Sequence, residues 1–243
     1  SYIRNINHNE RIIQGTHYAN KMILSCTECG LCGVMCDYDV DMKEVIKETK
    51  ISMVERKKMP QSAYDFALKD MKFSNSEKFF TYRKEPEKEN IKYVYPGCQL
   101  PASSPDYIEK IYRYLTDNIN EGTGLMLGCC GAPADWSGQN ELMKETAALI
   151  KNAWLELGKP TFILACSSCM SNFKKYMGEI SFISLWEVID EHKLPKMPFS
   201  QPIKLNIHDP CTSRNTQMQD SIRNIVSKIN CRVHELKHSK EFT

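Results

Sequence analysis

The sequence IKYVYPGC, residues 91–98, joins a short apolar segment to a turn that carries a cysteine. Ile91 to Tyr95 has the length and the aromatic and β-branched content that are typical of a strand. Pro96 and Gly97 are turn residues, so the strand is expected to end just before Cys98. The stretch therefore predicts a strand that presents a thiol at its carboxyl end.

The same order of strand, turn and cysteine recurs along the chain. The further strand candidates are Leu125 to Leu127, Thr161 to Ala165, Ile203 to Ile207 and Arg232 to Leu236. The cysteines that follow the first three of these are Cys129 with Cys130, Cys166 with Cys169, and Cys211. Most of the predicted strands therefore deliver a thiol directly after their last residue.

Helical patterns fill the gaps between these strands. Ser104 is a suitable N-cap, Pro105 suits the first position of a helix, and Gly158 can end the following helix. Strands that alternate with helices are typical of parallel βαβ units, so the predicted fold class is α/β with a parallel sheet. Because the carboxyl ends of parallel strands share one edge, these distant cysteines are expected to meet there.

A second group of cysteines, here called the N-terminal run, precedes this pattern. Its members are Cys26, Cys29, Cys32 and Cys36. Their spacing, C-x2-C-x2-C-x3-C, is the one that bacterial ferredoxins use for cubane [4Fe–4S] clusters. Gly30 and Gly33 permit the tight coil that this spacing needs. Structural zinc is the alternative, although it usually takes two more widely separated pairs of ligands. Asp37 follows the run where ferredoxin motifs have proline, and Cys36 either completes this cluster or has its partner motif outside the sequence.

Composition excludes several classes of protein. The 11 cysteines are odd in number and clustered, which disfavours a disulfide scaffold and favours metal or redox thiols in a reducing compartment, here the cytoplasm. The 32 basic and 30 acidic residues nearly cancel, so no nucleic-acid partner is expected. No apolar stretch approaches the roughly 20 residues of a membrane span, and no signal peptide is visible.

Five of the later cysteines, here called the CCG cysteines, have the spacing C-x30-C-C-x35-C-x2-C. They are Cys98, Cys129, Cys130, Cys166 and Cys169. Gly97 precedes the first of them, and Gly128 and Gly131 flank the adjacent pair. This pattern resembles the cysteine-rich CCG domain of the heterodisulfide reductase B-type subunit and its relatives. The resemblance extends over about Ile91 to Thr243, and an N-terminal ferredoxin-type run followed by this domain matches the family's order of modules.

The resemblance implies a function as well as a fold. It implies that all five CCG cysteines bind a second [4Fe–4S] cluster, of the noncubane type, and that the N-terminal run binds a cubane cluster. The chain is accordingly expected to be an electron-transfer subunit of an oxidoreductase, with a flavoprotein subunit as its redox partner. Direct reduction of a thiol or disulfide substrate at the CCG cluster is an alternative. From the residues alone, a zinc-stabilised interaction module and a metal-free redox pair at Cys166 and Cys169 also stay open.

The chain is predicted to have three parts. Residues 1–90 form the ferredoxin-type region, with a helix from Asp41 to Lys58 and a charged linker from Tyr82 to Asn90. Residues 91–202 form the CCG domain. Residues 203–243 begin a second CCG repeat, because Ile203 to Cys211 repeats the strand, turn and cysteine of Ile91 to Cys98.

That second repeat is expected to be incomplete. Its cysteine pair would be due near position 242, and no such pair occurs, so we expect a fragment or a form that has lost the second metal site. Cys231 fits neither motif and is expected to be a buried core thiol. His208 and Asp209 lie near the predicted sheet edge; hydrogen bonding within a turn is the favoured role for them, and proton handling is the alternative.

Overall fold

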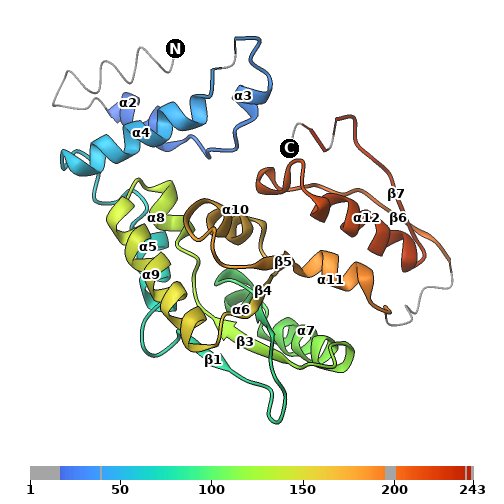
Figure 1. Cartoon of the computed structure of the whole chain (residues 1–243). Helices are drawn as coiled ribbons and strands as arrows, with labels where there is room; N and C mark the ends of the chain where they lie inside the picture. The colour runs from blue at the N-terminus through green and yellow to red at the C-terminus, as the bar shows by residue number, and fades with distance from the viewer. Residues whose placement is uncertain (1–16, 39, 195–200, 239, 242–243) are drawn as a thin grey trace. The chain divides into compact units, whose positions relative to one another are not determined.

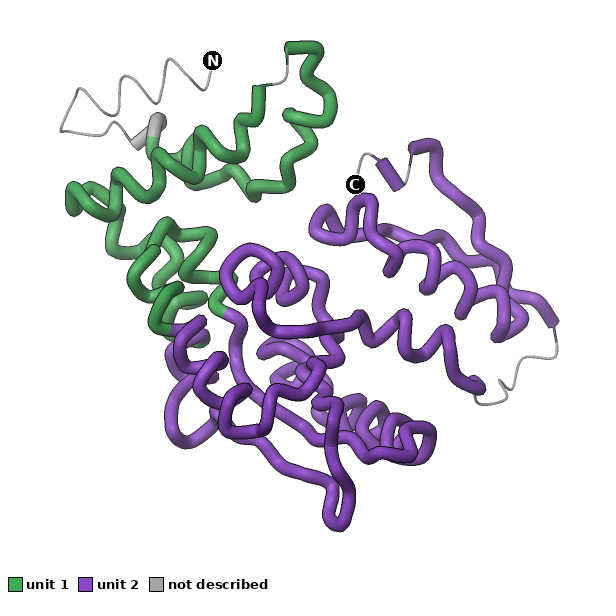
Figure 2. The backbone as a smooth tube through the Cα atoms, in the orientation of Figure 1, with its two compact units in different colours: residues 1–70, 131–145 green, residues 71–130, 146–243 purple. Residues whose placement is uncertain are grey.

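The computed structural model describes residues 17–38, 40–194, 201–238 and 240–241. The chain divides into two compact units (Figure 2). Unit 1 contains Ser1–Asp70 and Gly131–Glu145, and unit 2 contains Met71–Cys130 and Thr146–Thr243. The N-terminal run lies in unit 1, whereas all five CCG cysteines lie in unit 2. The three-part division predicted from the sequence stays a prediction.

The larger sheet of the described residues lies in unit 2 (Figure 1). Its strands are β1 (Thr81–Arg83), β2 (Lys92–Tyr95), β3 (Thr123–Leu127), β4 (Thr161–Leu164) and β5 (Phe182–Ser184). The spatial order is β1-β3-β2-β4-β5, with β1 antiparallel to β3 and every other neighbouring pair parallel. The predicted α/β class with a parallel sheet is therefore confirmed.

Helices connect the parallel strands. The helices that follow β2, β3, β4 and β5 in turn are α6 (Gln99–Ser103) with α7 (Pro105–Asn118), α8 (Ala132–Trp136) with α9 (Asn140–Glu156), α10 (Ser167–Tyr176) and α11 (Leu185–Glu191). A further helix, α5 (Asp65–Ser74), precedes β1. Ser104 occupies the N-cap position of α7 as expected, but its side chain makes no capping hydrogen bond, and its backbone N–H donates to the Leu100 carbonyl at 2.9 Å.

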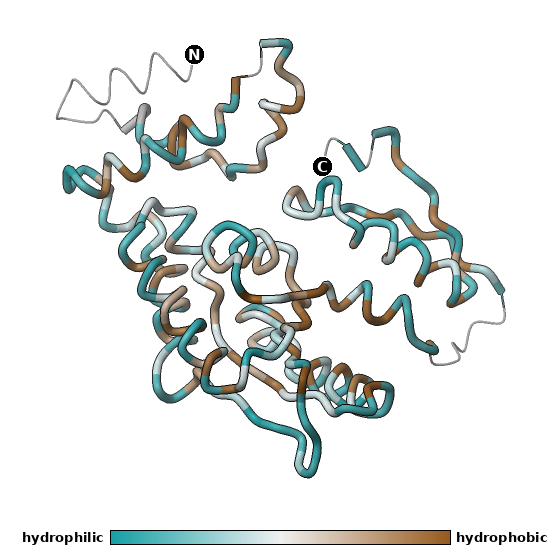
Figure 3. Tube along the Cα trace, viewed as in Figure 1, coloured by the Kyte–Doolittle hydropathy of each residue, from teal (hydrophilic) through white to brown (hydrophobic). Residues whose placement is uncertain are grey.

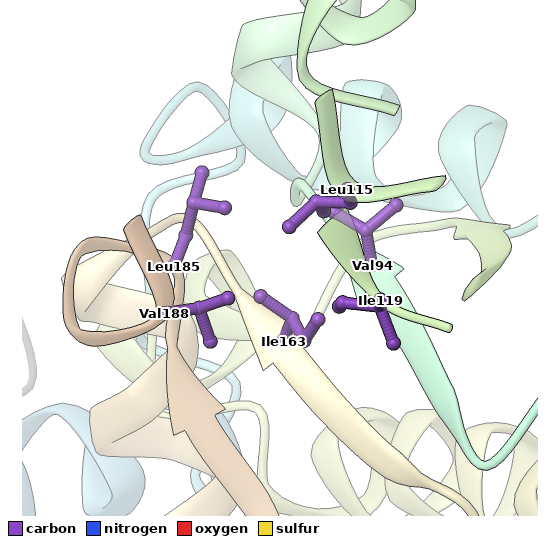
Figure 4. Close-up of a cluster of buried hydrophobic side chains, with 6 residues drawn as sticks. All are labelled: Val94, Leu115, Ile119, Ile163, Leu185 and Val188. Carbon is purple, nitrogen blue, oxygen red and sulfur yellow. The ribbon is translucent and has the colours of Figure 1, made fainter. Parts of the chain in front are cut away.

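Both faces of the central strands are buried. On one face, a cluster of aliphatic side chains joins β2 and β4 to α7 and α11 (Figure 4). Its members are Val94, Leu115, Ile119, Ile163, Leu185 and Val188. On the other face, the rings of Tyr95, Phe162 and Phe173 pack together at centroid separations of 5.6–6.0 Å. This aromatic layer connects strand β2 to helix α10, which carries one of the CCG cysteines.

The expected linker from Tyr82 to Asn90 is only partly correct. Tyr82 and Arg83 lie in β1 and pair with Met126 and Leu125 of β3. The rest is a hydrophilic connection (Figure 3) that ends at the buried Asn90. The side chain of Asn90 bonds to Glu85 and Lys88. The sequence concealed β1 because a three-residue edge strand containing arginine lacks the apolar run that marks a strand.

A smaller parallel sheet pairs β6 (Ile203–Leu205) with β7 (Cys231–Val233), and helix α12 (Gln217–Lys228) connects the two strands. This βαβ unit occupies the positions at which the sequence predicts a second repeat. Helix α12 packs against α11, and its Asn224 and Lys228 side chains bond to Asp190. Cys231 is buried, as expected.

The described part of unit 1 is helical and contains the N-terminal run. Its helices are α2 (His17–Leu24), α3 (Leu31–Val34), α4 (Met42–Glu55) and α8, with the start of α5 and the start of α9. Helix α4 starts as predicted, because the side chain of Asp41 accepts a hydrogen bond from the Lys43 N–H at 2.9 Å. Ile23, Ile46 and Met53 form the apolar core between α2 and α4. Among the described residues, no helix has the length and apolar character needed to cross a bilayer.

Candidate metal centre

The CCG cysteines follow three neighbouring parallel strands. Cys98 comes after β2, the Cys129–Cys130 pair after β3, and Cys166 after β4, and Cys169 lies in the first turn of α10. Strand β2 lies between β3 and β4 in the sheet. The carboxyl ends of these strands share one edge, so the chain path brings the cysteines to that edge as the sequence predicted.

The turn at Gly97 packs directly against the Cys166–Cys169 pair. Gly97 has φ of +81°, a conformation that a side chain disfavours. A Cβ atom built there would lie 3.2 Å from Sγ of Cys169 and 3.6 Å from Cβ of Cys166. The absence of a side chain at position 97 therefore allows the turn that carries Cys98 to reach the other two cysteines.

Three of the thiols form a hydrogen-bonded set. Hydrogen bonds with Cys130 and Cys166, together with burial, raise the pKa of Cys169 well above its usual value. Cys169 donates to Cys166, and this bond, with backbone hydrogen bonds, outweighs burial and lowers the pKa of Cys166 to about 6. Cys166 is therefore a thiolate at neutral pH, which is the form that binds metals.

The electrostatic surroundings of Tyr95 indicate that Cys98 and Cys129 lie near the three hydrogen-bonded cysteines. The pKa of Tyr95 is raised well above the usual value, first by burial and then by the negative charge that the nearby Cys169, Cys130, Cys129 and Cys98 carry when they are ionised. Four of the five cysteines thus lie near one phenol group, and the fifth, Cys166, is hydrogen-bonded to Cys169. The predicted convergence of these five side chains is therefore seen in the structure, whereas their role as ligands stays a prediction.

Two asparagines hold the backbone of the cysteine pair. The Asn75 Oδ1 atom accepts from the Cys129 N–H at 2.7 Å, and the Asn75 Nδ2 atom donates to the Cys129 carbonyl at 3.0 Å. Nδ2 of the buried Asn172 donates to the Cys130 carbonyl at 3.3 Å. Gly128 leaves room for Phe80 and Asn75, because a Cβ atom there would lie 2.8 Å from the Phe80 ring and 3.3 Å from the Asn75 Oδ1 atom. Sequence reasoning missed both asparagines.

The N-terminal run forms the loop between α2 and α4. Lys50 of α4, which is 0% exposed, bonds to Glu28 at 2.5 Å and donates to the Cys26 carbonyl at 3.3 Å. Burial lowers the pKa of Lys50, but hydrogen bonds to Glu28 and Tyr64 outweigh this effect and raise it. The buried ammonium group of Lys50 therefore links helix α4 to the loop at Cys26 and Glu28. Cys32 is exposed and the other three cysteines are half-buried.

A second buried lysine lies one turn earlier in α4. Lys47 bonds to the carboxylate of Asp135 at 2.6 Å and also to the Asp135 carbonyl oxygen. Asp135 belongs to α8, the helix that follows the Cys129–Cys130 pair along the chain. Both charged groups are buried, and sequence reasoning missed both the Lys47–Asp135 and the Lys50–Glu28 pair.

Asp209 and the turn at Cys211, which follow the CCG cysteines along the chain, make structural contacts. Asp209 is buried and forms an ion pair with Arg223 at 2.8 Å rather than the expected hydrogen bond within a turn, and Arg223 also pairs with Glu235. The turn that contains Cys211 is bonded to the start of α10 through Thr212 and Ser167, whose hydroxyl oxygens are 2.6 Å apart.

The donor set fits an iron–sulfur cluster. Five thiols exceed the four ligands of tetrahedral zinc, whereas a cluster of several irons can accept them. One thiol is already ionised, and the buried Tyr95 hydroxyl beside them has no hydrogen-bond partner in the protein. In the described part of the chain, no group of three or more His, Cys, Asp or Glu side chains is placed to hold a single metal ion.

Comparison with known proteins identifies the segment that carries these cysteines. No curated protein and no solved structure matches the chain. The family model of the CCG cysteine-rich domain matches residues 93–174, a range that includes all five CCG cysteines. This segment is therefore similar to a domain that is found in iron–sulfur and redox proteins and that suggests metal or iron–sulfur binding.

Proposed function

We propose that the chain is an iron–sulfur electron-transfer subunit of a heterodisulfide-reductase-like oxidoreductase. The CCG cysteines would hold a noncubane [4Fe–4S] cluster, and the N-terminal run would hold a cubane one. The observation that carries the proposal is the convergence of five thiols, from three strand ends and helix α10, around the turn at Gly97. When bound, such clusters supply one-electron transfer.

The protein contributes ionisation, burial and backbone support at the CCG site. The lowered pKa of Cys166 provides a thiolate without the need for strong base. Cys129, Cys130 and Cys169 are buried, which limits access of water and oxidants to their sulfur atoms. Asn75 and Asn172 hold the carbonyl groups of the cysteine pair, so two adjacent thiols can serve the same centre.

One cysteine of the N-terminal run is exposed to solvent, and electron transfer to a partner protein requires such an accessible edge. Cys32 is exposed, while the buried Lys50 and Glu28 hold the inner side of the loop. A redox protein, which we propose to be a flavoprotein subunit, could therefore approach this loop closely. Electrons would pass between this partner and the CCG site, or a thiol or disulfide substrate would be reduced there.

Anaerobic reconstitution with iron and sulfide tests the proposal. Two clusters require about eight irons and eight acid-labile sulfides per chain, with two distinguishable paramagnetic centres. Replacing Cys98 or Cys130 by serine should remove one centre, and replacing Cys29 should remove the other. Cys231→Ser is the matched control, since Cys231 is buried but belongs to neither set. Bound zinc without sulfide would refute the proposal in favour of an interaction module.

One observation favours a second candidate, metal-free dithiol chemistry. Cys166 precedes α10, has its pKa lowered to about 6 and is hydrogen-bonded to Cys169, as in redox-active C-x-x-C pairs. Such a pair would reduce a substrate disulfide to two thiols while forming the Cys166–Cys169 disulfide. Metal-free protein that reduces a model disulfide with one equivalent per chain would support this candidate. Loss of that reaction on loading with iron and sulfide would support the cluster instead.

A further inference from the structure

The hydroxyl group of Tyr95 is buried without a hydrogen-bond partner. Tyr95 is the last residue of β2, is 0% exposed, and packs its ring against the rings of Phe162 and Phe173. Its hydroxyl oxygen is one of the few buried side-chain polar atoms in the described residues that no protein group satisfies. A phenol usually finds a partner when it is buried, because leaving its O–H unpaired costs free energy.

Packing places this hydroxyl beside the CCG cysteines. Cys169 and Phe173 are four residues apart in α10 and therefore lie on the same side of that helix. The Phe173 ring contacts the Tyr95 ring at a centroid separation of 5.6 Å. Cys169, Cys130, Cys129 and Cys98 lie near enough to the hydroxyl group to influence it electrostatically when they are ionised. The group is therefore a buried hydrogen-bond donor without an acceptor in the protein, close to the CCG cysteines.

Tyr93 provides an internal comparison. It lies two residues earlier in β2, on the same face of the sheet, and is also 0% exposed with an unpartnered hydroxyl. Burial raises the pKa of Tyr93, and the neighbouring titratable groups that raise it further are Tyr112 and Tyr82, not cysteines. An unpartnered hydroxyl alone is thus not specific to a ligand site. What distinguishes Tyr95 is its position among the thiols.

We propose that the Tyr95 O–H donates a hydrogen bond to a sulfur atom of the iron–sulfur centre that the CCG cysteines hold, and that it thereby raises the reduction potential of that centre. The inference rests on the proposed function. A donated hydrogen bond stabilises the more negative, reduced form, and hydrogen bonds to sulfur are one of the factors that set cluster potentials. Tyr95 is accordingly a positioning and tuning residue, not a ligand.

The experiment compares Tyr95→Phe with Tyr93→Phe in the full chain, each reconstituted anaerobically with iron and sulfide. Redox titration followed by electron paramagnetic resonance gives the midpoint potential of the CCG centre. Y95F should shift that potential to a more negative value and speed iron release to a chelator roughly tenfold, the factor for about one hydrogen bond. Y93F should leave both quantities at the wild-type value, although it removes an equally buried hydroxyl from the same strand.

A second variant tests the inference if Y95F fails to take up iron and sulfide. With 3-fluorotyrosine at position 95 the fold is kept and the phenol is a stronger donor, so the potential should move to a more positive value than that of the wild type. Equal potentials for Y95F and the wild type, equal shifts in Y95F and Y93F, or no change on fluorination would overturn the inference while leaving the cluster in place. A wild-type chain without iron and sulfide would instead refute the proposed function.

Discussion

Removing the side chain of Asn75 should loosen the Cys129–Cys130 pair and lower the stability of unit 2. The carboxamide bonds to both backbone groups of Cys129, at 2.7 and 3.0 Å, and so replaces the partner that a neighbouring strand would supply. Cys129 itself is 1% exposed, so water does not readily replace this partner. Asn75→Ala therefore removes two hydrogen bonds whose backbone partners stay buried.

The magnitude follows from those two bonds. Each contributes about 1 kcal/mol net, and a buried backbone group that loses its partner costs up to about 3 kcal/mol, so the free energy of unfolding should fall by about 2–4 kcal/mol. Asn118→Ala is the matched control, because that side chain makes one hydrogen bond within α7, at 2.7 Å to Tyr114. Its loss should cost about 1 kcal/mol.

Urea unfolding of the reconstituted protein, followed by circular dichroism and by release of iron, measures both variants. In N75A, iron should leave at a lower urea concentration than in N118A, because the cysteine pair loses its support before the sheet unfolds. If N75A is no less stable than N118A and holds iron equally well, the two contacts to Cys129 contribute nothing to the site.

Three further substitutions or measurements test other parts of the structure. Gly97→Ala should weaken iron loading at the CCG site, because its Cβ would lie 3.2 Å from Sγ of Cys169 and would displace it. Gly158→Ala, with a similar positive φ and no atom within 4 Å, should cost only about 1–2 kcal/mol of stability and load normally. Lys50→Met should lower the free energy of unfolding by about 3–5 kcal/mol, because the Glu28 carboxylate stays buried without its cation. The double variant with Glu28→Gln should recover much of that loss, and urea unfolding measures both. In metal-free protein, mass spectrometry should find that the rate at which iodoacetamide alkylates Cys166 falls as the pH drops through about 6, since the thiolate then takes up a proton, and a midpoint near 9 would contradict the lowered pKa.

The convergence of the CCG cysteines could be predicted because it depends on two general rules. Apolar runs mark strands, and the ends of parallel strands share an edge. The groups that support the cysteines follow no such rule. Asn75 is 54 residues from Cys129, and Lys47 is 88 residues from Asp135, so only the folded chain shows that they meet. The strands β1 and β5 were missed because each has three residues and little apolar periodicity.

The cluster site at the N-terminal run stays a prediction from its spacing, and no local pattern indicated that a buried lysine would contact this loop. Lysine is seldom fully buried, and a helix with alternating charges is usually assigned a solvated face. Lys50 is buried because Glu28 and the Cys26 carbonyl satisfy its ammonium group, and those partners lie in a loop whose path no local pattern specifies.

The two buried lysines of α4 impose a constraint on the length of that helix. Lys47 reaches Asp135 and Lys50 reaches Glu28, so each anchors a different segment of unit 1. An α-helix turns by about 100° per residue, so inserting or deleting one residue between them would rotate one ammonium group away from its carboxylate and leave both charges buried. Over these positions, descendants of this sequence should accept substitutions on the outer face of α4 but no change in residue number.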